Sequence, residues 1–327
     1  MSLAEPSVDV LDLRHFSGAQ LAPLLRDEAE RWQARLHWQY DSAATLLLEY
    51  LNTRVLPGYA AYDRATRSVV GYGFCVYEAN KAVLGDIYAF DEAEGRPSPL
   101  VNRLLDHLLE MLMASPGIDR IESQLLMYPP GSFAPTLDRY GFQSFPRQFL
   151  MAPLSAPQLQ QPAMPLVPGS GLRLERWRPE HMHGAAALIQ RSYQDHGDAL
   201  INDQYRTVAG AERFLHNIIR FPGCGDFDAE HSLVLVDQNS GKPQALLLCS
   251  RVHQDTAHIT QLCIAPSLRG LGLGRMMLTI CAQQLWQRGL RHVSLTVTED
   301  NAQALKLYNS LGFSLLQRFE AIVWNKR

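Results

Sequence analysis

Hydrophobic and polar residues follow a pattern that occurs twice along the chain. In each half, short apolar runs typical of β-strands precede a longer run whose apolar residues recur at helical spacing. The expected strands are residues 59–62, 69–77 and 82–89 in the first half and residues 232–236, 244–252 and 258–264 in the second. The expected helices that follow are residues 100–113 and 274–287. Because each half combines strands with helices, the pattern predicts an α+β (mixed α/β) fold in two domains.

The two halves also end alike. The first closes with FAPTLDRYGF, residues 133–142, and the second with NAQALKLYNSLGF, residues 301–313. In both, a short helical run ends at Gly-Phe and a strand-like tail follows, so the glycine suits the left-handed position after a helix and the phenylalanine enters the core. The two phenylalanines, Phe142 and Phe313, are 171 residues apart. We infer an internal duplication, to which chance resemblance of two α+β domains is the alternative.

A proline-rich segment separates the halves. Residues 152–171, APLSAPQLQQPAMPLVPGSG, contain five prolines. Proline fixes φ and removes an N–H donor, so we expect a semi-extended linker without a regular helix or a central strand. The expected domains are residues 1–151 and 172–327, and each has a length of about 150 residues that suits one domain.

Composition narrows the functional classes. The 327 residues carry 30 Lys and Arg against 33 Asp and Glu, so no basic excess indicates a nucleic-acid partner. No apolar stretch approaches the roughly 18 residues of a membrane span, and the first residues lack the features of a signal peptide. The five cysteines are scattered without a C-x-x-C pair, which favours reduced thiols over disulfides or a zinc site. We therefore expect a cytoplasmic protein with no metal and no membrane or nucleic-acid partner.

The candidate chemistry lies in a glycine-rich turn between an expected strand and an expected helix. Residues 269–274 read RGLGLG, and Pro266 precedes them. Glycines have no Cβ atom, so the backbone N–H groups of such a turn can converge on an anion, and the helix N-terminus adds partial positive charge. Arg269 and Arg275 flank the turn as cationic donors. The segment therefore predicts a pyrophosphate site, with a turn that serves only packing as the alternative.

Two other phosphate-binding motifs do not fit this segment. A Walker A loop needs Lys followed by Ser or Thr, and no such pair follows the glycines. A dinucleotide fingerprint needs a third glycine where Met277 stands, and an acidic residue farther on where the sequence reads HVSLTV.

The pattern R-x-x-G-x-G from Arg269 to Gly274 resembles the acetyl-CoA loop of the GNAT superfamily of N-acetyltransferases. A second motif of that family, N-x-x-A-x-x-L-Y-x-x-L-G-F, is matched by residues 301–313, after an expected strand at residues 292–298. The resemblance covers residues 172–327. It implies two GNAT-like domains, each a mixed, mostly antiparallel sheet with a splayed central strand pair flanked by helices.

The resemblance implies a role for each motif. The backbone of the splayed strand would pair with pantetheine, the loop amides would hold the pyrophosphate, and Tyr308 would act as the general acid that protonates the departing CoA thiolate. The residues implied to bind acetyl-CoA are Leu262, Cys263, Ile264, Arg269, Gly270, Leu271, Gly272, Leu273, Gly274, Arg275 and Asn301. An N-cap at Asn301 and a half-buried helix aromatic at Tyr308 are the structural alternatives.

The motifs leave the general base open. Several members of the family carry Glu at the position of Thr296, and Thr cannot accept the proton. His258, in the expected splayed strand, has an ordinary pKa suited to the task and is the candidate base. A water chain, or an amine that arrives neutral, would serve instead.

The first half shares only the coarse pattern. In place of the glycine loop it reads FDEAEGRPSPLVN, residues 90–102, with three acids and one glycine. Carboxylates there would repel a pyrophosphate, and Pro97 and Pro99 lack the N–H groups that could bind it. Leu137 falls at the position of Tyr308. We expect a degenerate domain without acetyl-CoA, which packs against the second half as a pseudo-dimer partner or helps to wall the acceptor cleft.

The sequence thus predicts an acetyl-CoA-dependent N-acetyltransferase in which a small-molecule or peptide amine attacks directly in a ternary complex. An acidic rim between residues 193 and 228 would suit a cationic acceptor, with a solvated face as the alternative. Its members are Asp195, Asp198, Asp203, Asp226 and Asp228. A non-catalytic acyl-CoA sensor and an O-acetyltransferase are the rival functions, and either a monomer or a homodimer is compatible with the pattern.

Overall fold

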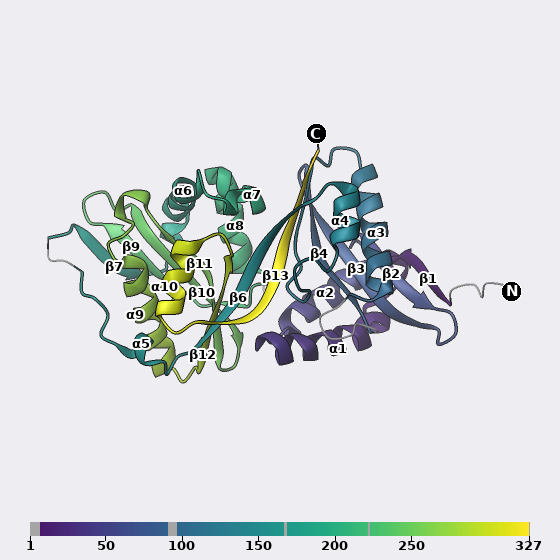
Figure 1. The fold of residues 1–327 in the computed structure, drawn as a ribbon, viewed down its shortest axis with the longest axis horizontal. Helices are drawn as coiled ribbons and strands as arrows, with labels where there is room; N and C mark the ends of the chain where they lie inside the picture. Colours follow the sequence, from purple (N-terminus) through teal and green to yellow (C-terminus); the bar gives the residue numbers. More distant parts are fainter. Residues whose placement is uncertain (1–6, 91–96, 167–168, 222, 327) are drawn as a thin grey trace. The chain divides into compact units, whose positions relative to one another are not determined.

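The computed structural model describes residues 7–90, 97–166, 169–221 and 223–326 (Figure 1). The chain forms two compact units. The first consists of residues 1–35, 40–146 and 318–327, and the second of residues 36–39 and 147–317.

The first unit is a mixed sheet with helices. Its strands are β1 (Val8–Asp12), β2 (Gly58–Asp63), β3 (Ser68–Glu78), β4 (Lys81–Ala89), β5 (Arg120–Gln124) and the end of β13 (Ser314–Asn325). Its helices are α1 (Gly18–Leu36), α2 (Asp41–Thr53), α3 (Pro99–Ala114) and α4 (Ala134–Tyr140). The strand order is β1-β2-β3-β4-β5-β13, and β4 and β5 run parallel whereas the other pairs are antiparallel.

The second unit repeats this architecture. Its strands are β6 (Gln143–Pro153), β7 (Leu172–Arg176), β8 (Asp226–Phe227), β9 (Leu233–Asp237), β10 (Pro243–His253), β11 (Thr256–Ile264) and β12 (His292–Thr298). Its helices are α5 (Pro157–Gln160), α6 (Met182–Tyr193), α7 (Asp198–Ile201), α8 (Val208–Arg220), α9 (Leu273–Gln287) and α10 (Ala302–Ser310). The order is β6-β12-β11-β10-β9-β7, with β8 paired to β10. The predicted mixed, mostly antiparallel sheet flanked by helices is confirmed.

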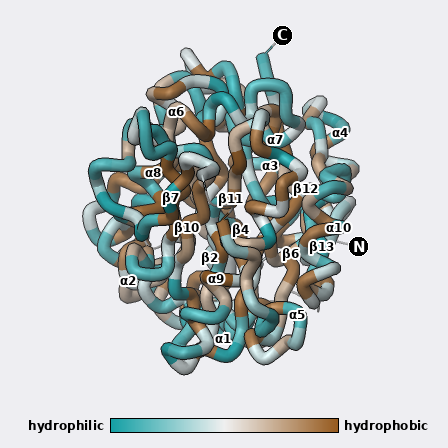
Figure 2. The backbone as a smooth tube through the Cα atoms, turned by 90° about the vertical axis from the view of Figure 1, so that its left-hand side faces the viewer, coloured by the Kyte–Doolittle hydropathy of each residue, from teal (hydrophilic) through white to brown (hydrophobic). Residues whose placement is uncertain are grey.

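Both faces of the second sheet are covered by helices. Leu235 and Leu247 point to the α9 side, whereas their neighbours Val234 and Leu246 point to the side of α6 and α8. Alternate residues of a strand face opposite sides, so a strand between two helical layers needs apolar residues at nearly every position. This is why β10 reads as a continuous apolar run from residue 245 to residue 249 and why brown segments follow the central strands in Figure 2.

The parallel strands β11 and β12 separate partway along their length. Their pairing joins Thr256–Ile259 to His292–Leu295, and among the described residues it does not continue beyond Ile259. A bulge at Thr260 interrupts the register between β10 and β11 at the same level, because Cys249 faces Ile259 and Leu248 faces Gln261. A bulge bends its strand, and this one lies where β11 and β12 stop pairing. The predicted splayed strand pair is therefore present.

The ends of the two halves are exchanged between the units. Residues 147–153 of β6 pair with β12, and residues 321–325 of β13 pair with β5. The units therefore differ from the expected division into residues 1–151 and 172–327. The expected linker also differs, because Pro153 ends β6 and residues 157–160 form α5. Pro157 occupies the first turn of α5, where a helix has no use for the missing N–H group.

No helix in the described ranges is long and apolar enough to cross a membrane.

The exchange predicts that the end of the chain stabilises the first unit. Ile322 is fully buried and pairs with Ser123 of β5. Ile322→Ala is expected to lower the free energy of unfolding by about 2–5 kcal/mol, because it leaves a cavity in a packed sheet. Leu316→Ala, on the same strand but 40% exposed, is the control and is expected to have little effect. Denaturant unfolding gives the stability, and hydrogen exchange of the β5 amides locates the loss; unchanged β5 protection in Ile322→Ala would contradict the exchange.

Candidate functional site

A cavity of about 320 Å³ opens in the second unit beside the part of β11 that has left β12. Every residue predicted to bind the cofactor lines it except Leu271, which is 58% exposed. Tyr308 lines it as well. The cavity wall also contains Ser192, Tyr193, His196, Leu268, Gln303, Ala304 and Leu307.

The glycine turn presents free backbone N–H groups to this cavity. Gly270 and Gly272 have φ values of 80° and 77°, in the left-handed region that favours glycine. Gly272 is the N-cap of α9, and the first helical bond runs from the Met276 N–H to the Gly272 carbonyl. The N–H groups of Leu273 and Gly274, like all those in a first helical turn, have no acceptor within the helix. A Cβ atom at Gly272 would lie 3.2 Å from Met164 Cε, so the turn leaves little room for a side chain.

The two flanking arginines also hold the turn in place. Arg269 Nη2 donates a 2.6 Å hydrogen bond to the carbonyl of Ser192 at the end of α6. The Ser192 hydroxyl in turn donates to the carbonyl of Ile264, at 3.3 Å. The Arg275 guanidinium donates to the hydroxyl of Ser310 on α10. The turn is therefore fixed to α6 and α10, and α6 in turn to β11. Its two cations add to the partial positive charge of the helix N-terminus.

The splayed part of β11 has one paired and one open edge. Toward β10, Leu262, Cys263 and Ile264 stand in register with Leu247, Leu246 and Ala245. Toward β12 the ladder has already ended, so an extended chain could pair with this edge. Burial raises the pKa of the Cys263 thiol to about 12, so this cysteine is a packing residue rather than a nucleophile.

Tyr308 and Asn301 come from the second motif. Tyr308 is buried on α10, and burial, together with the charge of Asp198, raises the pKa of its phenol. The phenol therefore keeps its proton at neutral pH and can donate it. Asn301 is the N-cap of α10, where its Oδ1 accepts the Ala304 N–H at 3.1 Å, and its Nδ2 lies 3.3 Å from His196 Nε2. Asn301 therefore caps α10 and also lines the cavity.

His258 does not fit the predicted role of base. It is buried and does not line the cavity; its Nδ1 lies 2.9 Å from the Ser294 hydroxyl. Its ring packs against Trp38 and Phe149, with centroids 5.0 and 5.5 Å away. Burial, and then the charge of Arg147, lower the pKa of His258 to about 3. The part of β11 that pairs with β12 places His258 in this packed aromatic layer. It is therefore a neutral core residue.

No sequence motif predicted the network of polar side chains that lies beside the cavity. Gln261, the first residue after the bulge, donates from Nε2 to the Tyr193 hydroxyl at 3.1 Å and accepts from the Tyr205 hydroxyl at 3.4 Å. The two tyrosine rings stack with centroids 4.4 Å apart. Asp198 accepts a hydrogen bond from the hydroxyl of Thr298 at the end of β12. These partners are far apart in sequence, so only the fold brings them together.

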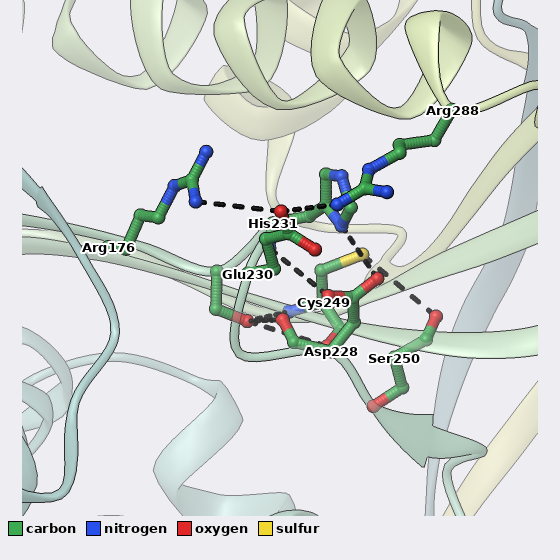
Figure 3. Close-up of polar contacts among 8 residues, drawn as sticks. Arg176, Asp228, Glu230, His231, Cys249, Ser250 and Arg288 are labelled. Atoms are coloured by element: carbon green, nitrogen blue, oxygen red, sulfur yellow. Dashed lines mark hydrogen bonds and ion pairs between the residues drawn. The ribbon is translucent and has the colours of Figure 1, made fainter.

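A second polar cluster lies elsewhere in the second unit (Figure 3). Asp228 Oδ2 lies 2.7 Å from His231 Nδ1. Burial acts to raise the pKa of Asp228, but the hydrogen bond and charge of His231 outweigh it and lower that pKa. Glu230 forms ion pairs with Arg176 and Arg288. The cluster follows β8, which pairs with the end of β10 remote from the glycine turn, so Asp228 does not belong to an acidic rim of the cavity.

In the described ranges no group of three or more His, Cys, Asp or Glu side chains could hold a metal ion.

In the first unit, the acidic loop expected in place of the glycine turn falls mainly on residues 91–96, outside the described residues. Pro99 begins α3 after the N-cap Ser98, and Leu137 is buried in the core. Where β4 has left β5, polar side chains fill the interior: the Tyr72 hydroxyl donates to Glu28 at 2.6 Å and the Tyr40 hydroxyl to Asp86 at 3.1 Å.

Comparisons with known proteins agree with this geometry. Residues 198–313 match a family model described as the acetyltransferase (GNAT) family. A mycothiol acetyltransferase of Thermobifida fusca is 38% identical over 98 residues, which are 27% of this chain and 30% of that protein. A peptidyl-lysine N-acetyltransferase YjaB of Salmonella typhimurium is 30% identical over 139 residues, which are 40% of this chain and 86% of that protein.

A solved structure shares the fold over nearly the whole chain. It is a tandem GNAT protein from the clavulanic acid biosynthesis pathway, with a TM-score of 0.62, 14% identity, and coverage of 97% of this chain and 98% of that one. The predicted tandem layout is thereby confirmed. The curated mycothiol relative, in contrast, is matched over less than a third of its length.

The environment of Tyr308 predicts a pH dependence of stability. The folded-state pKa of its phenol is raised above the ordinary value of 10.0. Above about pH 10 the unfolded chain therefore loses a proton that the folded chain keeps, and the free energy of unfolding falls as pH rises. Tyr308→Phe is expected to make this fall less steep, measured by denaturant unfolding between about pH 9 and 11. An identical slope in both proteins would contradict the burial of an un-ionised phenol.

Proposed function

The chain belongs to the GNAT family of acetyltransferases, and from that premise we propose that it is an acetyl-CoA-dependent N-acetyltransferase whose site is the cavity of the second unit. The observation that carries the proposal is the convergence of three features on one cavity: the N–H groups of the glycine turn, the open edge of β11 and the protonated phenol of Tyr308. No one of these features alone would specify the chemistry.

Acetyl-CoA would be held at two places along its length, the pyrophosphate and the pantetheine arm. The N–H groups of Leu273 and Gly274, with the charge of Arg275 beside them, would bind the pyrophosphate, because a helix N-terminus attracts anions. The open edge of β11 from Leu262 to Ile264 would pair with the amide groups of the pantetheine arm. The fit is supported by Gly272, whose positive φ and close approach to Met164 favour a residue without a side chain at the start of α9.

The bound cofactor supplies an acetyl group activated as a thioester. The amine nitrogen of the acceptor would attack that carbonyl carbon directly, the C–N bond would form and the C–S bond would break. Tyr308 would hold the proton that the departing sulfur takes, and its burial keeps that proton available at neutral pH. Because His258 is buried and neutral, we propose that the acceptor amine reaches the site unprotonated or loses its proton to water. After the attack the nitrogen releases a second proton to water, and water returns a proton to the Tyr308 phenolate, so the net change moves one proton from nitrogen to sulfur.

We propose a small-molecule or peptide amine as the acceptor. The names of the relatives, a mycothiol acetyltransferase and a peptidyl-lysine N-acetyltransferase, support this class. Asp198 also supports it, because its Oδ2 lies 3.7 Å from Nδ1 of His196 on the cavity wall, and negative charge there would favour an approaching cationic amine.

We propose that the first unit binds no acetyl-CoA. Support comes from the interior where β4 leaves β5, since Glu28 and its hydrogen-bonded tyrosine fill that space. Glu28 is fully buried, and burial raises its pKa well above the usual range. The expected stoichiometry is one cofactor per chain.

Isothermal titration with acetyl-CoA tests the cavity. The unaltered protein is expected to bind at one site per chain, and Gly272→Asp/Gly274→Asp is expected to abolish binding, because two carboxylates would repel the pyrophosphate and fill its cradle. Gly289→Ala is the control, since Gly289 also has a positive φ, 89°, but lies outside the cavity. Two sites per chain would overturn the assignment of the first unit, and no binding by the folded protein would overturn the function itself.

Tyr308→Phe tests the acid. It is expected to lower turnover by about 100-fold, a typical contribution of a positioned general acid, with the affinity for acetyl-CoA little changed. Thiol release with a panel of primary amines gives the turnover, and Tyr140→Phe, at a half-buried tyrosine of the first unit, is the control. Unchanged turnover would remove Tyr308 as the acid, and binding without thiol release from any amine would favour a sensor.

A further inference from the structure

His196 lies on the cavity wall without belonging to either sequence motif. It sits in the loop between α6 and α7, and 29% of its side chain is exposed. The edge of its ring meets the ring of Tyr193, with centroids 5.3 Å apart. Its Nε2 faces Asn301 and its Nδ1 faces the start of α7.

The backbone fixes which nitrogen of His196 carries the proton. The N–H of Asp198 donates a 3.1 Å hydrogen bond to His196 Nδ1. A nitrogen that accepts a hydrogen bond carries no proton of its own, and a neutral imidazole has one N–H group. The proton of neutral His196 is therefore on Nε2.

The orientation of the Asn301 amide is fixed in the same way. Its Oδ1 accepts the Ala304 N–H at 3.1 Å as the N-cap of α10, so its NH₂ group points away from the helix. That Nδ2 lies 3.3 Å from His196 Nε2. An amide NH₂ group donates only, as does an Nε2 that carries a proton.

Two hydrogen-bond donors thus face each other on the cavity wall. Neither can accept from the other, and moving the imidazole proton to Nδ1 would set it against the Asp198 N–H instead. Protonating the ring would place donors against donors on both sides; the nearest carboxylate oxygen, Asp198 Oδ2, is 3.7 Å from Nδ1, beyond hydrogen-bond distance. The pair is satisfied only by a third atom with lone pairs that lies within hydrogen-bond distance of both groups.

We propose that His196 Nε2–H and Asn301 Nδ2–H together bind a carbonyl oxygen of the acyl-CoA molecule. This inference rests on the proposed function, since the same cavity wall includes the open edge of β11. The molecule carries such oxygens at the thioester and at the two amides of its pantetheine arm. A carbonyl oxygen has two lone pairs and accepts two hydrogen bonds in the plane of its substituents, which is what two converging donors require.

Isothermal titration with acetyl-CoA and with CoA tests the donor pair. His196→Leu is expected to weaken binding about three- to tenfold, the effect of one hydrogen bond to a neutral oxygen. His196→Gln is expected to keep the affinity within about twofold, because its amide can supply the missing N–H group. His183→Leu, whose side chain is 82% exposed and outside the cavity, is the control and is expected to bind normally.

The two ligands distinguish the source of the oxygen. A loss seen only with acetyl-CoA identifies the thioester carbonyl, whereas an equal loss with both ligands identifies an amide of the pantetheine arm. Unchanged affinity in His196→Leu, or a loss in His196→Gln as large as in His196→Leu, would overturn the donor pair while leaving the proposed function in place. Absence of binding by the unaltered protein would reject the proposed function and the donor pair with it.

A measurement without ligand keeps the inference testable if the leucine variant does not fold. Nitrogen-15 chemical shifts of the histidine rings distinguish a protonated from an unprotonated nitrogen. In the unaltered protein, His196 is expected to carry its proton on Nε2 at neutral pH. A proton on Nδ1 would overturn the donor pair directly.

Discussion

The site depends on the early end of one parallel strand pair. β11 and β12 share four residue pairs and then separate at the bulge of Thr260. Beyond this point β11 still pairs with β10 and β12 still pairs with β6, but among the described residues no pairing joins the facing edges of β11 and β12. Unpaired backbone groups away from water are costly. The separation is therefore stable only where a ligand, water or polar side chains pair with these groups.

The duplicated units complete this opening in different ways. The first residue after the bulge is Gln261 in the second unit and, by the same register argument, Asp86 in the first. Each is hydrogen-bonded to a tyrosine hydroxyl. In the first unit the fully buried Glu28 adds a second carboxyl group to the interior, whereas in the second unit Leu262, the residue after Gln261, lines the cavity. One backbone plan thus yields a filled core in one unit and a cavity in the other.

The sequence predicted the parts of the site that depend on local backbone requirements. Gly270, Gly272 and Asn301 have identifiable roles because positive φ values and an N-cap each restrict the residue type. The sequence could not place His258 correctly, because burial depends on Trp38 and Phe149, which come from distant segments. It also could not assign residues 147–153 to the second unit, because that strand pairing joins segments more than a hundred residues apart.

His196 shows what a side-chain network adds to a motif. No sequence motif includes His196. Its proposed role follows from two hydrogen bonds: the Asp198 N–H fixes its tautomer, and the N-cap bond of α10 orients the Asn301 amide. Each bond is an ordinary structural contact that would form in a protein without a ligand. Together they orient two hydrogen-bond donors toward the same point of the cavity, where neither donor can accept from the other.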